Sequence, residues 1–89
     1  MISRITEEFR INFDALPLEV QTKAISKYKI WKTNPGHPSL RFKQIHISKP
    51  VFSIRISIAY RALGLKEGDT IIWFWIGSHS DYDKLIKNL

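Results

Sequence analysis

The sequence predicts an α+β fold: two N-terminal helices packed on a small antiparallel sheet of three to four strands, followed by a short C-terminal helix. Two observations carry this prediction. Apolar residues recur at helical spacing up to about residue 33, and after residue 40 they alternate or run continuously as in strands. The chain has 89 residues, of which 44% are hydrophobic, so we expect a single globular domain over residues 1–89.

Two helices are expected before the sheet. Thr6 can cap a first helix that runs to Ala15, and the two glutamates that follow Thr6 suit the positive end of its dipole. Pro17 ends that helix and fits the first turn of the next one. From Leu18 to about Thr33 the apolar residues keep an i, i+4, i+4, i+3 rhythm, which predicts an amphipathic helix.

The remaining chain has strand periodicity. Leu40 to Ile47 is a plausible strand. Val51 to Tyr60 alternates strictly, which predicts one half-buried strand, or two strands joined by a bend near Ser57–Ala59. Lys66–Asp69 reads as a hairpin turn with a glycine available for a positive φ. Thr70 to Ile76 is apolar on both faces, which predicts a strand in the centre of the sheet.

A short helix is expected at the end of the chain. Ser78 or Ser80 can cap it, and it runs through Leu85 and Ile86. With the two earlier helices, this order predicts helices packed on one face of the sheet. Trp73 and Trp75 belong to a strand that is apolar on both sides, so core or partner-contact roles are favoured over stacking on nucleic-acid bases.

The charge of the chain is unevenly distributed. Fourteen Lys and Arg against eight Asp and Glu give a net charge of +6, and from Val20 to Lys66 there is no acidic residue. Such a block is explained by a polyanionic partner, either nucleic acid or an acidic protein, or by a merely basic surface. The first explanation makes five residues candidates for RNA binding: Arg41, Lys43, Lys49, Lys23 and Lys27.

Several classes of protein are excluded by composition. The absence of cysteine excludes a disulfide scaffold, a thiolate metal site and a thiol nucleophile. His37 and His46 have no partner at a metal-ligand spacing; we assign the first to a loop and the second to a strand, and expect no metal or other cofactor. The longest apolar runs fall far short of the length needed to span a membrane. We therefore expect a cytoplasmic protein that does not bind a membrane.

Four residues are candidates for a catalytic site. Arg55 and Arg61 lie on the polar face of the alternating segment, and six residues of straight strand would hold them about 20 Å apart, so a shared site needs the bend. The two arginines could clamp a phosphate, or they could belong to a solvated sheet face or form an ion pair with the acidic residues near the chain ends. His79 follows the most buried strand and could transfer protons or simply cap a helix. Tyr82 could contribute its hydroxyl there or belong to the core.

Five segments of the chain resemble one known family when they are read in order. In chain order the segments are Leu16-Pro17, Asn34-Pro35-Gly36-His37-Pro38-Ser39-Leu40-Arg41-Phe42-Lys43, Phe52-Ser53-Ile54-Arg55-Ile56, Ala59-Tyr60-Arg61 and Trp75-Ile76-Gly77-Ser78-His79-Ser80-Asp81-Tyr82. Their order, spacing and total length are similar to those of the RelE/ParE superfamily of bacterial toxins from type II toxin–antitoxin systems. The resemblance covers nearly the whole chain and implies a RelE-like fold, in which the first strand common in the superfamily is either absent or confined to Ile2–Ile5.

The resemblance also implies an activity. In the RNA-cleaving branch, basic residues of the sheet and a residue after the last strand surround the mRNA phosphate. By position these become Lys43, Arg55, Arg61 and His79 in this sequence. The implied function is a ribosome-dependent mRNA endonuclease that inhibits translation, with mRNA, the ribosome and a cognate antitoxin as partners. The alternative is a ParE-type toxin that inhibits DNA gyrase by binding and has no nuclease activity.

Overall fold

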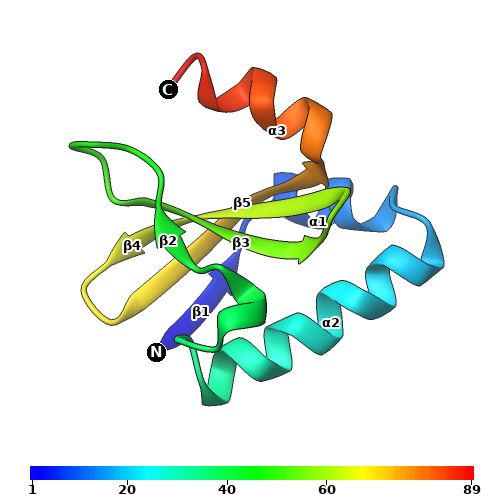
Figure 1. Cartoon of the computed structure of the whole chain (residues 1–89), viewed down its shortest axis with the longest axis horizontal. Helices are drawn as coiled ribbons and strands as arrows, with labels where there is room; N and C mark the ends of the chain where they lie inside the picture. Colours follow the sequence, from blue (N-terminus) through cyan, green and yellow to red (C-terminus); the bar gives the residue numbers. More distant parts are fainter.

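The structure, a computed structural model, describes all 89 residues and consists of one five-stranded mixed sheet with helices on both faces (Figure 1). In chain order its elements are β1 (Ile2–Ile5), α1 (Glu7–Asp14), α2 (Leu18–Thr33), a 3-10 turn η1 (Pro38–Leu40), β2 (Lys43–Gln44), β3 (Val51–Ser57), β4 (Tyr60–Glu67), β5 (Thr70–Ser78) and α3 (His79–Ile86). The order of strands across the sheet is β1-β5-β4-β3-β2. The predicted α+β class and helix order are therefore confirmed.

The predicted sheet was too small. The sequence indicated three to four antiparallel strands, whereas β1 adds a fifth strand that runs parallel to β5. It pairs residue by residue from Ile2 opposite Thr70 to Ile5 opposite Trp73. Because β1 has four residues and its partner strand lies almost 70 positions away, the local pattern of apolar residues does not predict this strand. The strand β5 has neighbours on both sides, as predicted, although β4 occupies the middle of the sheet.

The segment before β3 is mostly not a strand. Leu40 to Ile47 was expected to be extended, but only Lys43–Gln44 pairs with β3. Upstream, η1 buries Leu40 completely and ends at Arg41 in the left-handed conformation, with φ 47°. Downstream, the ring Nδ1 of His46 accepts hydrogen bonds from the backbone N–H groups of Ser48 at 3.1 Å and Lys49 at 2.9 Å. His46 therefore lies in the β2–β3 loop and not in a strand.

The bend near Ser57–Ala59 is present. It divides the alternating segment into β3 and β4, which pair as an antiparallel hairpin. The β4–β5 turn follows, where Gly68 has φ 59°, as the Lys66–Asp69 turn predicted. The side chain of Thr6 accepts the backbone N–H of Phe9 at 3.1 Å and so caps α1.

The two faces of the sheet carry separate cores. Helices α1 and α2 cover one face, where Trp31 and Trp73 form an edge-to-face pair with ring centroids 5.3 Å apart. Helix α3 covers the opposite face, where Tyr82 packs with Val51 and Leu63 (Figure 1). The expectation that all helices share one face was wrong. Leu63 points away from α1 and α2, and it is buried on the opposite face by residues that include Tyr82 of α3.

Gly64 makes room for the larger core. A Cβ at Gly64 would lie 2.7 Å from Cγ2 of Ile71 and 2.9 Å from Cε3 of Trp73. We therefore expect Gly64→Ala to destabilise the fold by about 1–3 kcal/mol through overpacking. Thermal unfolding followed by circular dichroism measures this loss. Gly36→Ala is the matched control, since its Cβ would meet nothing closer than 3.7 Å. Equal midpoints for the two variants would contradict the close packing of Trp73 on Gly64.

Candidate active site

The bend between β3 and β4 brings the two candidate arginines together. Arg55 pairs directly with Arg61 across the hairpin, and Arg61 pairs with Gly77 on its other side. Register places both arginines on the face of the sheet that α3 covers, because Arg61 and the inward-facing Leu63 are two residues apart. The 20 Å separation of a straight strand is therefore replaced by adjacent positions.

The guanidinium of Arg61 is anchored by the turn that precedes it. Its Nη1 donates to the carbonyl oxygen of Ser57, and also to those of Ile58 at 3.3 Å and Tyr60 at 2.9 Å. Burial lowers the pKa of Arg61, and the charge of Arg55 lowers it further. The group is thus held rigidly, with one terminal nitrogen used by the turn.

A third arginine, Arg41, lies near the other two. Arg41 adds to the lowering of the Arg61 pKa, so three guanidinium groups from separate segments lie within electrostatic reach of one another. The backbone of Arg41 is left-handed, a conformation that costs energy for a residue other than glycine. Such strain is concentrated at functional sites in proteins, which is consistent with a binding role for Arg41.

A basic groove leads to these arginines. It has a volume of about 710 Å³ and lies between α2, η1 and the end of β3. Its lining includes three serines and no carboxylate. Four cationic side chains line it: Lys23, Lys27, Arg41 and Arg55. Three of the five predicted RNA-binding residues therefore share this groove with Arg55.

The other two predicted RNA-binding residues lie outside the groove. Lys43 pairs with Ser53, which register places on the same face as Arg55, two residues along β3. Lys49 belongs to the β2–β3 loop. The period of the predicted Leu40–Ile47 strand would place Arg41 and Lys43 on one face, where they could line a phosphate groove together. That expectation is wrong, because Arg41 ends η1 and belongs to no strand.

His79 is the first residue of α3 and lies beside the β3–β4 turn. Its backbone N–H donates to the carbonyl oxygen of Ala59 at 2.7 Å, so the turn that anchors Arg61 also fixes the start of α3. Its ring Nε2 lies 3.4 Å from Oδ1 of Asp83. The two side chains are one helical turn apart and are 46% and 56% exposed, so this contact lies at the surface of α3. Asp83 was missed from the sequence, although its i, i+4 spacing from His79 was a usable signal.

Tyr82 lies in the smaller core and beneath His79. Its side chain is 8% exposed, and its ring centroid lies 5.8 Å from that of His79 and 6.5 Å from that of Trp75. An ionised Tyr82 phenolate would oppose the lowering of the Arg61 pKa, so Tyr82 lies near both His79 and Arg61.

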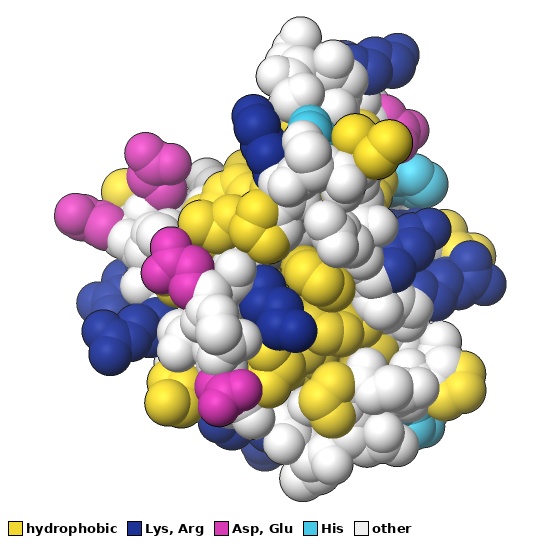
Figure 2. All heavy atoms as spheres, turned by 90° about the vertical axis from the view of Figure 1, so that its left-hand side faces the viewer, with side chains coloured by type: hydrophobic (Ala, Val, Ile, Leu, Met, Phe, Trp, Pro, Cys, Tyr) yellow, Lys and Arg dark blue, Asp and Glu magenta, His cyan; other side chains and the backbone are white.

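The positive side chains of the molecule are not paired with its negative ones. The structure has one histidine–carboxylate contact, between His79 and Asp83, and no lysine or arginine forms a salt bridge with a carboxylate. Figure 2 shows Asp and Glu gathered mainly on one side of the view, whereas Lys and Arg occur on both sides of a central apolar band. Unpaired cations on this scale favour an anionic partner.

The histidines and the helices bear on metal binding and on membrane insertion. No group of three His, Cys, Asp or Glu side chains is arranged to hold a metal ion. Nδ1 of His37 accepts the backbone N–H of Ser39 at 3.1 Å, which accounts for this loop histidine. None of the helices has the length and apolar character needed to cross a bilayer.

Several solved structures have the same fold. The toxin–antitoxin complex RelB–RelE from Methanococcus jannaschii matches with a TM-score of 0.72 and 20% identity, covering 91% of this chain and 96% of that one. YafQ from E. coli strain BL21(DE3) matches with a TM-score of 0.73 and 8% identity, covering 90% and 94%. The toxin–antitoxin complex RelBE2 from Mycobacterium tuberculosis matches with a TM-score of 0.70 and 17% identity, covering 88% and 96%. The architecture is therefore the RelE-like toxin fold.

The sequence itself gives the family. The model of the ParE-like toxin domain matches residues 18–84, which is most of the chain. A search of curated proteins gave no match. The chain belongs to the RelE/ParE superfamily of toxins from type II toxin–antitoxin systems.

Proposed function

We propose that this toxin is an mRNA endonuclease that acts on translating ribosomes. The observation that supports this proposal best is the cluster of Arg41, Arg55 and Arg61 beside the His79–Asp83 pair. Three like charges in one place repel one another. Asp83 attracts Arg61 electrostatically, but no carboxylate of the chain forms a salt bridge with any of the three arginines. A bound phosphate would offset that repulsion, and arginine is suited to hold it through two parallel hydrogen bonds.

The proposed reaction uses the ribose of the substrate as the nucleophile. A base removes the proton of the 2′-hydroxyl, and the 2′-oxygen then attacks the adjacent phosphorus in line. The bond from phosphorus to the 5′-oxygen breaks, and that oxygen takes up a proton. The products are a 2′,3′-cyclic phosphate and a 5′-hydroxyl. Arg55 and Arg61 would stabilise the added charge on the phosphate, and His79 would carry out one of the two proton transfers.

The basic groove would hold the RNA on one side of the cut. Replacing both Lys23 and Lys27 by alanine should weaken binding of a single-stranded RNA and reduce the salt dependence of that binding. Two lost phosphate contacts should reduce the slope of log K against log salt by roughly 1.4. Fluorescence anisotropy with a 2′-O-methyl RNA measures the slope. Lys29→Ala is the control on α2, since Lys29 is exposed and does not line the groove. An unchanged slope in the double variant would remove the groove from RNA binding.

Transcript mapping after brief induction tests the proposed activity in cells. In-frame cuts within translated mRNA are expected. An SOS response with intact mRNA would contradict the proposal and indicate a gyrase-directed toxin instead. The Methanococcus and Mycobacterium relatives were crystallised with antitoxins, and we propose that this chain likewise binds a cognate antitoxin.

A further inference from the structure

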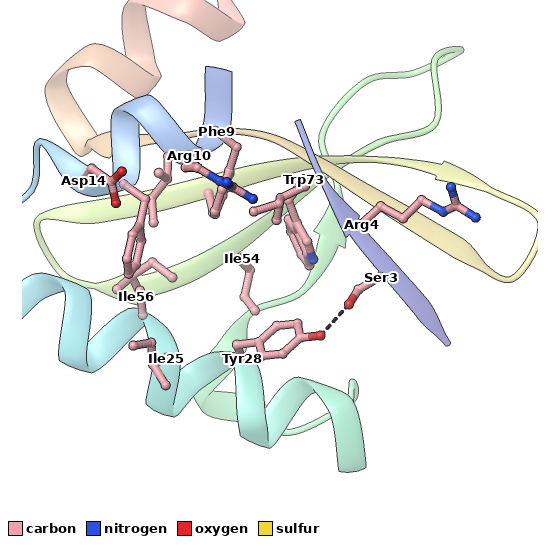
Figure 3. Close-up of a pocket in the computed structure, with 15 residues that line it drawn as sticks. Ser3, Arg4, Phe9, Arg10, Asp14, Ile25, Tyr28, Ile54, Ile56 and Trp73 are labelled. Carbon is pink, nitrogen blue, oxygen red and sulfur yellow. Dashed lines mark hydrogen bonds between the residues drawn. The ribbon is translucent and has the colours of Figure 1, made fainter. Parts of the chain in front are cut away.

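Helix α2 has a groove on each side. Between α1, α2 and β1 lies an apolar groove of about 600 Å³, whose walls include Phe9 of α1 and Ile25 of α2 (Figure 3). It opens because α1 packs on β5 whereas α2 packs on β3. The basic groove lies on the opposite side of α2, and only there do η1 and the residue after it contribute to the lining, through Pro38, Ser39 and Arg41. The conformation of η1 therefore bears on the basic groove and not on the apolar one.

The turn η1 begins with a histidine cap. Nδ1 of His37 accepts the backbone N–H of Ser39 at 3.1 Å and lies 2.8 Å from Oγ of the same serine. So short a helix has few backbone bonds of its own. The N–H of Leu40 donates to the carbonyl oxygen of His37 at 3.1 Å, and that of Arg41 donates to Pro38 at 3.3 Å. The imidazole therefore supplies one of the few hydrogen bonds that hold this turn.

The position of Arg41 depends on η1. Its backbone has φ 47°, which is unfavourable for a residue other than glycine, so the neighbouring chain must hold it there. The fully buried Leu40 fixes one end of η1, and the His37 cap fixes the other. His37 does not line the basic groove, so it can act on a ligand there only through Ser39 and Arg41.

A second histidine has the same local geometry. Nδ1 of His46 accepts the backbone N–H groups of Ser48 and Lys49, so a His-x-Ser sequence folds around a ring nitrogen on each side of β2. Both bonds need an unprotonated Nδ1, because a protonated ring nitrogen only donates. A candidate RNA-binding cation is attached to each turn: Arg41 follows the first, and the N–H of Lys49 closes the second.

The charged groups around η1 are all cationic. Lys32, in the last turn of α2, donates to the carbonyl oxygen of Met1. The basic groove has no carboxylate, and His37 forms no salt bridge. The cations that line it are Lys23, Lys27, Arg41 and Arg55. A proton on Nδ1 of His37 would remove an acceptor and add a further positive charge among these side chains. Histidines change charge between about pH 5 and 8, so acidification alone can remove the cap.

We infer that His37, in its neutral form, is a positioning residue that holds Arg41 in the basic groove. This inference rests on the proposed function for the identity of the ligand, which is single-stranded RNA. Nδ1 of His37 accepts the N–H of Ser39, this cap fixes η1, and η1 places Arg41 within electrostatic reach of Arg55 and Arg61. His37 itself takes no part in the chemistry.

A double-mutant cycle on RNA binding tests this role, by fluorescence anisotropy with a 2′-O-methyl RNA at a pH where histidine is neutral. His37→Ala should reduce the slope of log K against log salt by roughly 0.7, the value for one lost phosphate contact to a single strand, and Arg41→Ala should do the same. In the Arg41→Ala background, His37→Ala should change nothing further. His37→Asn should bind like the parent chain, because its Oδ1 is as far along the side chain as Nδ1 and accepts the same N–H.

Amide signals of ¹⁵N-labelled protein follow the turn without any ligand. Between about pH 8 and about pH 5, the signals of Ser39 and Arg41 should move together with the protonation of the His37 ring. In His37→Asn they should stay in place. The amide signal of Tyr28, which lines the apolar groove, is the control and should not follow the His37 ring.

Three results would overturn the positioning role. They are a parental salt slope for His37→Ala, an equal further loss in the Arg41→Ala background, and an Arg41 signal that does not follow the His37 ring. Any of them would leave the proposed function standing if the parent chain binds RNA. A parent chain that binds no RNA would contradict the proposed function instead, and the amide titration would then decide whether His37 positions Arg41.

Discussion

Replacing Arg61 or His79 by alanine should lower single-turnover cleavage of mRNA on programmed ribosomes by two or more orders of magnitude. Loss of a charge partner of the transition state typically costs about 10²–10³ in rate, and loss of a general acid or base about 10²–10⁴. Arg61→Lys should recover little, because an ammonium group cannot replace both the bonds to the turn carbonyls and a forked contact to phosphate.

Arg61→Ala also removes the hydrogen bonds that hold the β3–β4 turn, so a second variant must separate charge from structure. Arg55→Ala serves this purpose, because the side chain of Arg55 makes no hydrogen bond within the chain and is paired with Arg61 across the hairpin. It should keep the parental circular dichroism and thermal midpoint while losing cleavage. Folded Arg55 and His79 variants that cleave at the parental rate would exclude this site from the mechanism.

The largest effect on stability is expected for Trp73→Ala, with a loss of about 3–5 kcal/mol. Trp73 is 4% exposed, forms an edge-to-face pair with Trp31 and lies 6.4 Å from Phe42 between ring centroids. A loss of that size approaches the whole stability of a small domain, so toxicity should disappear through unfolding and not through chemistry. Urea denaturation measures the loss, and Ile58→Ala, at a position that is 75% exposed, is the control. A parental urea midpoint for Trp73→Ala would contradict its place in the core.

Local patterns were sufficient for the elements that carry their own signals. Thr6 predicted the start of α1 because its cap acts within one turn, and the apolar stripe after Pro17 predicted α2. The segment around Trp73 is apolar at successive positions, and therefore on both faces of a strand, which predicted that β5 is an inner strand. By contrast, β1 is stabilised by pairing with a strand that is distant in sequence, and its four residues are too few to show a strand periodicity.

The sequence indicated candidate site residues but not how they are arranged in space. The sequence indicated Arg55, Arg61 and His79, but their proximity depends on the β3–β4 bend and on the β4–β5 register. The position of Arg41 in a left-handed turn arises from the packing of Leu40 in the core, which alternation cannot reveal. The apolar groove between α1 and α2 has no sequence signature either, because it results from how two helices are spaced on a sheet.

The chemistry of the RNA ends tests the central claim most directly. Purified toxin, ribosomes programmed with a defined mRNA and initiator tRNA are mixed, and the fragments are examined for their termini. The account predicts a cut within the codon exposed on the ribosome, with a 2′,3′-cyclic phosphate on one fragment and a 5′-hydroxyl on the other, and no cut with Arg55→Ala. Intact mRNA under these conditions, or fragments with a 5′-phosphate, would contradict it.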